Sequence, residues 1–129
     1  MPERVAYAID DSRWPLLVSS ATEFINDPDA LEASYRRLEQ ILTRKQRFVL
    51  IFDMRGAASS SARRKKFIEW CERNSEGLTT YLVAGAVIVG SSVERGFATA
   101  TMWLRTPPWP TKVFEDPREA EAWLRTLLG

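Results

Sequence analysis

The chain has 129 residues, enough for one domain built around a single hydrophobic core. Its hydrophobic fraction of 45% and charged fraction of 27% exclude a disordered composition, and its net charge of +1 gives no overall field for a nucleic acid or an anionic membrane. One cysteine, no signal-peptide segment and no apolar run of about 20 residues predict a single cytoplasmic domain over residues 1–129, without a membrane span.

The first elements predicted are a hairpin and a helix. Apolar runs at residues 5–9 and 14–18 flank the polar residues 10–13, which predicts two strands joined by a turn, with Pro15 favouring an edge. Asp27 followed by Pro28 is typical of a helix start, because the carboxylate can cap free N–H groups and proline lacks one. Apolar residues at three- and four-residue spacing then predict its buried face: Leu31, Tyr35, Leu38 and Leu42.

Two uninterrupted apolar runs predict strands inside the sheet, because strands covered on both faces do not alternate. These runs are residues 48–52 and 82–89, with a helix from about Ser61 to Asn74 between them. Ser91 and Glu94 form a capping box that predicts the start of another helix. The expected core stripe of this helix consists of Val93, Phe97, Ala100 and Leu104.

A short strand at residues 112–114 and a helix capped by Asp116 complete the chain. The buried positions expected in that helix are Ala120, Trp123 or Leu124, and Leu127. Apolar strands that alternate with amphipathic helices indicate parallel pairing with right-handed crossovers. The sequence therefore predicts an α/β fold, with a single-layer, mixed but mostly parallel five-stranded sheet and four helices.

Two segments of the sequence are similar to a known family. FVLIFDMRG at residues 48–56 resembles the central strand of the STAS domain and its Asp-apolar-x-Gly ending, and VFEDPREAEAWL at residues 113–124 resembles the closing strand and helix of SpoIIAA-like proteins. The chain thus resembles the STAS/SpoIIAA-like group, which includes STAS/SEC14-type proteins. The resemblance implies that fold and a bacterial, non-enzymatic regulatory or scaffolding domain that binds another protein or itself, as anti-sigma-factor antagonists do.

The sequence departs from the STAS pattern at the phosphoacceptor. STAS antagonists carry an Asp-Ser-Ser-Gly-Leu segment in which a serine accepts phosphate from a partner kinase. An ungapped register from Asp53 places Ala62 at that serine and Ser61 at the acid before it. The phosphoacceptor signature is therefore missing. The SEC14-type resemblance implies an alternative function, a small carrier or sensor of an apolar or phosphorylated ligand.

Residue types also limit the chemistry. The chain contains no histidine, which excludes Ser-His-Asp and Cys-His catalysis, and one cysteine with scattered carboxylates does not make a closed zinc site. Glycine-rich phosphate loops are missing from the sequence. We therefore expect no metal, no cofactor and no enzymatic activity. Cys71, on the helix face that contains Phe67, is interpreted as a small core residue.

Asp53 is the candidate for a strand-end site, because open α/β sheets bind ligands at the carboxyl ends of their strands. An ion pair with Arg55 is the favoured interpretation, and an enzyme that uses Asp53 is the third hypothesis for function. Catalysis would need a second group, for which the candidates at neighbouring strand ends are Ser91, Ser92 and Asp10.

Two further segments are candidate binding surfaces. The helix that follows Asp53 has a basic first turn, although the helix dipole favours acids there. Ser59, Ser60, Ser61, Arg63 and Arg64 could therefore bind an anion or an acidic partner, while a solvated basic face is the alternative. Trp103, Pro108 and Trp109 lie at a proline-rich helix end, where exposed aromatic rings would suit an interface, while rings that cap the core are the alternative.

Overall fold

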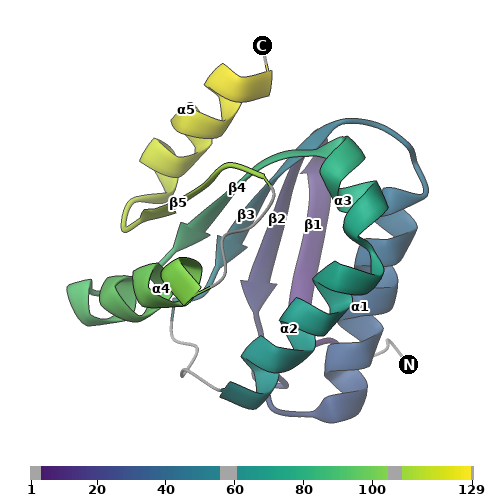
Figure 1. Ribbon diagram of the computed structural model, residues 1–129, viewed down its shortest axis with the longest axis horizontal. Helices are drawn as coiled ribbons and strands as arrows, with labels where there is room; N and C mark the ends of the chain where they lie inside the picture. The colour runs from purple at the N-terminus through teal and green to yellow at the C-terminus, as the bar shows by residue number, and fades with distance from the viewer. Residues whose placement is uncertain (1–3, 56–60, 105–108, 129) are drawn as a thin grey trace.

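The computed structural model of the chain describes residues 4–55, 61–104 and 109–128, excluding the side chains of residues 97 and 100–104. Its elements in chain order are β1 (Tyr7–Arg13), β2 (Leu16–Ala21), α1 (Pro28–Leu42), β3 (Phe48–Asp53), α2 (Ser61–Arg73), α3 (Ser75–Tyr81), β4 (Leu82–Ile88), α4 (Ser92–Leu104), β5 (Thr111–Phe114) and α5 (Pro117–Leu128). The strands form a five-stranded sheet with helices around it (Figure 1).

The strands of the sheet lie in their chain order, β1-β2-β3-β4-β5. β1 pairs with β2 antiparallel, and the pairs β2–β3, β3–β4 and β4–β5 are parallel. The predicted mixed, mostly parallel sheet is confirmed. The apolar runs at residues 48–52 and 82–89 form the neighbouring internal strands β3 and β4, which are covered on both faces.

The amino-terminal hairpin is present, but its turn lies later than predicted. β1 continues through the polar residues Asp10 to Arg13, and Arg13 pairs with Leu16, so the connection is Trp14–Pro15. β1, and not the strand that follows Pro15, is an edge strand of the sheet, with β5 at the opposite edge. The polar residues of β1 fit a strand because Asp10 and Ser12 are exposed there.

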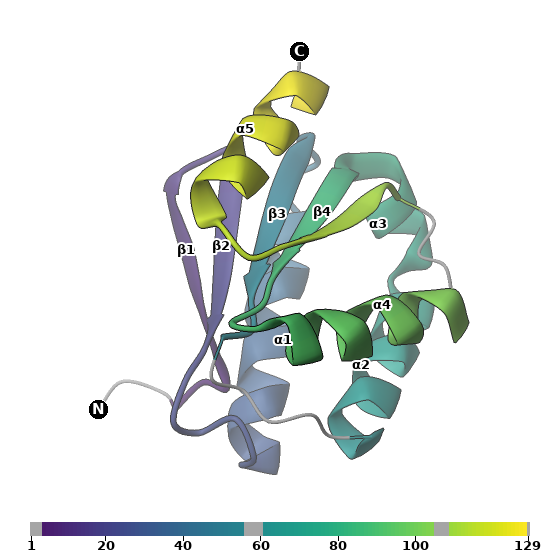
Figure 2. The same cartoon turned by 90° about the vertical axis from the view of Figure 1, so that its left-hand side faces the viewer.

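The helices cover both faces of the sheet. α1, α2 and α3 lie on one face and α5 on the other (Figure 2). Consecutive residues of a strand point to opposite faces, so Leu17 and Leu50 enter the core beneath α1, α2 and α3, whereas Leu16 and Val49 enter the core beneath α5. α4 contacts β5, at the edge of the sheet away from β1.

The structure has one helix more than predicted, α3, which is separated from α2 by the single residue Asn74. Glycine at position 77 and threonine at positions 79 and 80 are poor helix formers, which hides this helix in the sequence. The helix forms because its residue Leu78 is buried in the core and because α3 contacts α1 and β4. Tertiary contact with α1 therefore overrides local propensity.

The predicted core stripes are confirmed for α1 and partly for α5. Leu31, Tyr35 and Leu38 are buried, and Leu42 packs against them half-buried. In α5, Ala120 and Leu124 are fully buried. Leu127 is 37% exposed, so its predicted burial is wrong. The next residue, Leu128, packs against the core beneath α5, so Leu127 lies on the side of α5 that is turned away from the sheet.

The predicted burial of Val93 on α4 is also wrong, because this side chain is 68% exposed. The physical reason is the place of α4, which contacts the short edge strand β5 instead of lying across the central strands. The other residues of the predicted stripe, Phe97, Ala100 and Leu104, have side chains outside the described part of the chain.

No helix within the described ranges is long and apolar enough to cross a membrane; α1, with 15 residues, is the longest of them.

Candidate functional site

The carboxyl ends of the parallel strands bring polar side chains from β2 and β3 together. In the sheet register Ser20 of β2 pairs with Asp53 of β3, which pairs with Ile88 of β4. Side chains at paired positions of neighbouring strands point to the same face, so Ser20 and Asp53 are neighbours. Asp10 does not belong to this row, since β1 runs antiparallel and places Asp10 opposite Val18. Its proposal as a strand-end partner is therefore wrong.

Asp53 forms a bidentate ion pair with Arg55, as the favoured interpretation predicted. Arg55 Nε donates to Asp53 Oδ1 at 2.9 Å and Nη2 donates to Oδ2 at 2.7 Å. The Arg55 backbone N–H also donates to Oδ1, at 3.2 Å. These hydrogen bonds lower the pKa of Asp53 below its ordinary 3.8 and raise the pKa of Arg55. Asp53 is therefore ionised and paired at neutral pH, which makes it a weak proton acceptor.

The capping box predicted at Ser91 and Glu94 begins α4 beside this ion pair. Ser91 Oγ accepts a hydrogen bond from the Glu94 N–H at 3.2 Å, and Glu94 Oε2 accepts one from the Gly90 N–H at 2.9 Å. A Cβ atom at Gly90 would lie 3.8 Å from Arg55 Cγ and only 2.8 Å from Glu94 Oε2. Glycine at position 90 thus leaves room for the Glu94 carboxylate, and Arg55 lies within ordinary contact distance of the same position. The Ser91 hydroxyl serves the cap, while the Ser92 side chain is exposed.

The basic start of α2 differs from the predicted anion site. Ser59 and Ser60 lie outside the described residues, and Ser61 is exposed. Arg63 shares a helix face with Phe67 and with Trp70, which is 3% exposed, so Arg63 points inward and donates to the Tyr7 hydroxyl.

Arg64 is half-buried, whereas Lys65 and Lys66 are exposed. The structure therefore does not bring Ser61, Arg63 and Arg64 together on one open surface. The helical period explains this correction, because neighbouring residues of a helix point in different directions.

Trp109 is 8% exposed and belongs to the core beneath α1, α2 and α3, so the expectation of an exposed ring is wrong. Its indole lies over Gly85 of β4, where a Cβ atom would lie 3.3 Å from Nε1. The missing side chain of Gly85 thus makes room for the large ring. Pro108 and the side chain of Trp103 lie outside the described part of the chain.

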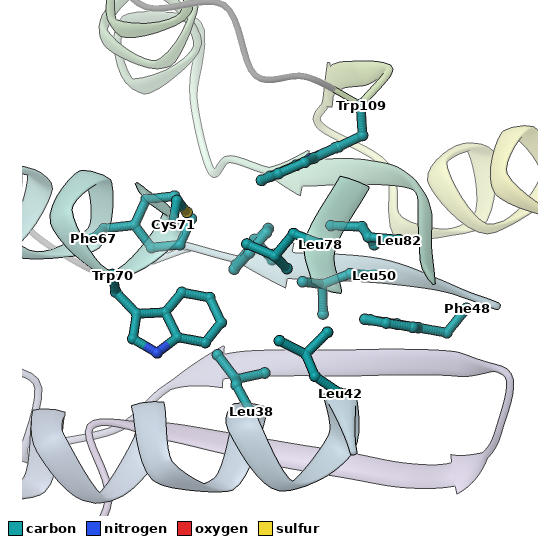
Figure 3. Close-up of a pocket in the computed structure, with 11 residues that line it drawn as sticks. Leu38, Leu42, Phe48, Leu50, Phe67, Trp70, Cys71, Leu78, Leu82 and Trp109 are labelled. Atoms are coloured by element: carbon teal, nitrogen blue, oxygen red, sulfur yellow. The ribbon is translucent and has the colours of Figure 1, made fainter. Parts of the chain in front are cut away.

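A small apolar cavity lies between this core and the helices (Figure 3). The centre of a water molecule could occupy about 10 Å³ of this cavity, so the cavity has room for about one water. Trp109 lines it with Cys71, which is half-buried and packs against the core as interpreted. The other lining residues are Leu38, Leu42, Phe48, Leu50, Phe52, Phe67, Trp70, Leu78 and Leu82.

Sequence reasoning missed three contributions. Ser20 becomes a neighbour of Asp53 through strand pairing. Gly90 contributes by leaving room for the Glu94 carboxylate, and Val93 contributes through its exposure. The glycine directly after a buried strand was the one available signal.

Among the described residues there is no group of three or more acidic or cysteine side chains that could hold a metal ion.

Comparison with known proteins gives one family and one fold. Residues 19–128 match the family described as Domain of unknown function (DUF7793). No curated protein matches the chain. A crystal structure of an uncharacterised protein of the DUF3478 family from Shewanella loihica PV-4, described as having a SpoIIAA-like fold, is similar with a TM-score of 0.59 and 16% identity, over 96% of this chain and 98% of that one. The predicted SpoIIAA-like fold is confirmed, and the chain belongs to the DUF7793 family.

Proposed function

We propose that the chain is a non-enzymatic regulatory or scaffolding domain that acts in the cytoplasm by binding another protein at the start of α4. The observation behind this proposal is the exposure of Val93, at 68%. Scattered apolar residues are normal on protein surfaces, so the position of Val93 matters more than its exposure alone. It lies in the first turn of α4, at the carboxyl edge of the sheet, where α/β proteins bind their ligands.

The surroundings of Val93 fit a protein interface. Ser92 is exposed beside it, and the Arg55 side chain, 49% exposed, lies against Gly90 just before the helix. We call Arg55, Ser92 and Val93 the Val93 surface. An apolar anchor among polar groups, with an arginine, is the composition that interface hot spots favour. The capping box and the Asp53–Arg55 pair hold this surface in place before a partner binds, which reduces the entropy lost on association.

The ion pair also supports the non-enzymatic part of the proposal. Arg55 occupies both oxygens of Asp53, and the sequence supplies no histidine as a second proton-transfer group. Regulation of the STAS type is proposed by likeness of fold, and Ala62 at the phosphoacceptor position implies that binding does not depend on that phosphorylation. The apolar cavity, with room for about one water, gives no support to a carrier of apolar molecules.

Affinity capture from a lysate of the source cells, with mass spectrometry of both proteins and small molecules, tests this function. The baits are the wild-type chain, Val93→Ser and the matched control Leu127→Ser, which removes the other exposed large apolar side chain of the described residues. We expect a protein in stoichiometric amount that Val93→Ser loses and Leu127→Ser keeps. Self-association through Val93 would identify a second copy as the partner. A small molecule captured without any protein would favour the carrier and contradict the proposal.

A further inference from the structure

Three polar side chains from separate elements meet inside the molecule near the carboxyl edge of the sheet. Tyr7 is the first residue of β1 and pairs with Ala21, the last residue of β2. Tyr35 comes from α1, and Arg63 from the first turn of α2. The Arg63 guanidinium donates a hydrogen bond to the Tyr7 hydroxyl, and its charge also acts on Tyr35. The guanidinium therefore contacts the Tyr7 hydroxyl, and its charge reaches the Tyr35 hydroxyl.

The hydroxyl of Tyr35 is the unusual member of this group. The residue is 5% exposed, and its Oη atom has no hydrogen-bond partner among the described residues. The ring itself is well packed, stacked on Trp70 with the ring centroids 5.4 Å apart. Leaving a buried hydroxyl without a partner destabilises the fold, and such groups in folded proteins usually have a reason. An acceptor from a ligand would satisfy this hydroxyl.

The electrostatics of the group favour a negatively charged acceptor. Burial raises the pKa of Tyr7 and of Tyr35, so both hydroxyls keep their protons at neutral pH and can donate them in hydrogen bonds. Arg63 adds a permanent positive charge, and the first turn of α2 contains no acid. One negative charge also acts on Tyr35, that of the Glu32 carboxylate, which is exposed on α1.

We propose that Tyr7, Tyr35 and Arg63 form a binding site for a small oxyanion, either a phosphate group or a carboxylate. Tyr35 is the buried member of this site, while Tyr7 and Arg63 are half-buried. The ligand accepts hydrogen bonds from the Tyr35 hydroxyl and the Arg63 guanidinium. This site lies on the α1 and α2 face, and it does not depend on the proposed function of the Val93 surface.

Binding of inorganic phosphate, methyl phosphate and acetate to the full chain tests the site. Calorimetric titration and the melting temperature are measured at a constant ionic strength of about 0.15 M, at which exposed charges are largely screened. Each anion that binds the folded state raises the melting temperature with its concentration. A preference for inorganic phosphate indicates free phosphate as the ligand, and a preference for methyl phosphate indicates a phosphorylated molecule. A preference for acetate indicates a carboxylate.

Variants separate this site from nonspecific attraction to the basic helix. Tyr35→Phe keeps the ring stacked on Trp70 and should weaken binding about tenfold or more, because a hydrogen bond to a charged group is lost. Glu32→Gln should strengthen binding by removing a repulsive charge. The control Lys65→Gln/Lys66→Gln, at exposed positions of the same helix, should bind like the wild type. The proposal is overturned if no anion binds saturably, if Tyr35→Phe binds as tightly as the wild type, or if only the lysine control loses binding.

Discussion

Replacing Trp109 with alanine tests the assignment of this ring to the core. The ring is 8% exposed, lies over Gly85 and lines the existing apolar cavity. Removing the ring loses its buried apolar contacts and enlarges that cavity. Gly85 has no side chain that could fill the space. Tryptophan-to-alanine changes at buried positions cost about 3–5 kcal/mol, and we expect this range for Trp109→Ala.

Urea denaturation followed by circular dichroism measures the free energy of unfolding, and thermal denaturation gives a second estimate. For a domain of this size the expected loss lowers the melting temperature by roughly 10–20 °C. Trp109→Phe is the matched variant, since it keeps an aromatic ring over Gly85 and should lose only part of the stability.

A loss below about 1 kcal/mol for Trp109→Ala would refute the core assignment, because that is the range of surface substitutions. If such a stable variant also failed to bind the protein captured by the wild-type chain, the original expectation of a Trp109 interface would be correct. Unchanged binding by a strongly destabilised but folded variant supports the present assignment.

Two further predictions concern the carboxyl edge. Because the folded-state pKa of Asp53 lies below its ordinary 3.8, the Asp53–Arg55 pair stabilises the fold above that pH and loses its contribution as the pH falls through the folded-state pKa. Acid denaturation should therefore show a smaller decrease in stability below pH 3.8 for Asp53→Asn than for the wild type; an identical pH dependence would contradict the role of the pair. Ser91→Ala removes the hydroxyl that accepts a hydrogen bond from the Glu94 N–H at the start of α4, and it should lower the free energy of unfolding, measured in urea, by about 0.5–2 kcal/mol. Ser92→Ala, at the next and exposed position, should have little effect. Equal losses in the two serine variants would show that the cap is not the cause.

Much of the fold could be predicted because its signals are local. Asp27 accepts hydrogen bonds from the first N–H groups of α1, as the Asp-Pro pair predicts, and Asp116 accepts one at the start of α5. The apolar runs of β3 and β4 predict internal strands through composition alone. α3 was missed because its residues have low helix propensity and its stability comes from contacts with α1 and β4, which are formed only in the folded chain.

The parts of the candidate site that could be predicted are the contacts between residues close together in the sequence. Asp53 and Arg55 are two residues apart, so their pairing could be expected. Trp109 and Gly85 meet only in the folded chain, and the proline-rich context of the ring gave the wrong indication of exposure. Tyr7, Tyr35 and Arg63 come from a strand and two helices, and no local pattern reports that they converge.

The most direct test of the central claim is the dissociation constant of the captured protein partner for three forms of the chain: wild type, Val93→Ser and Leu127→Ser. Val93 is exposed in the free domain, so Val93→Ser should leave the free energy of unfolding nearly unchanged. We expect Val93→Ser to weaken binding about tenfold or more, because an apolar anchor is lost, and Leu127→Ser to bind like the wild type. Equal affinities for the wild type and Val93→Ser would contradict the central claim.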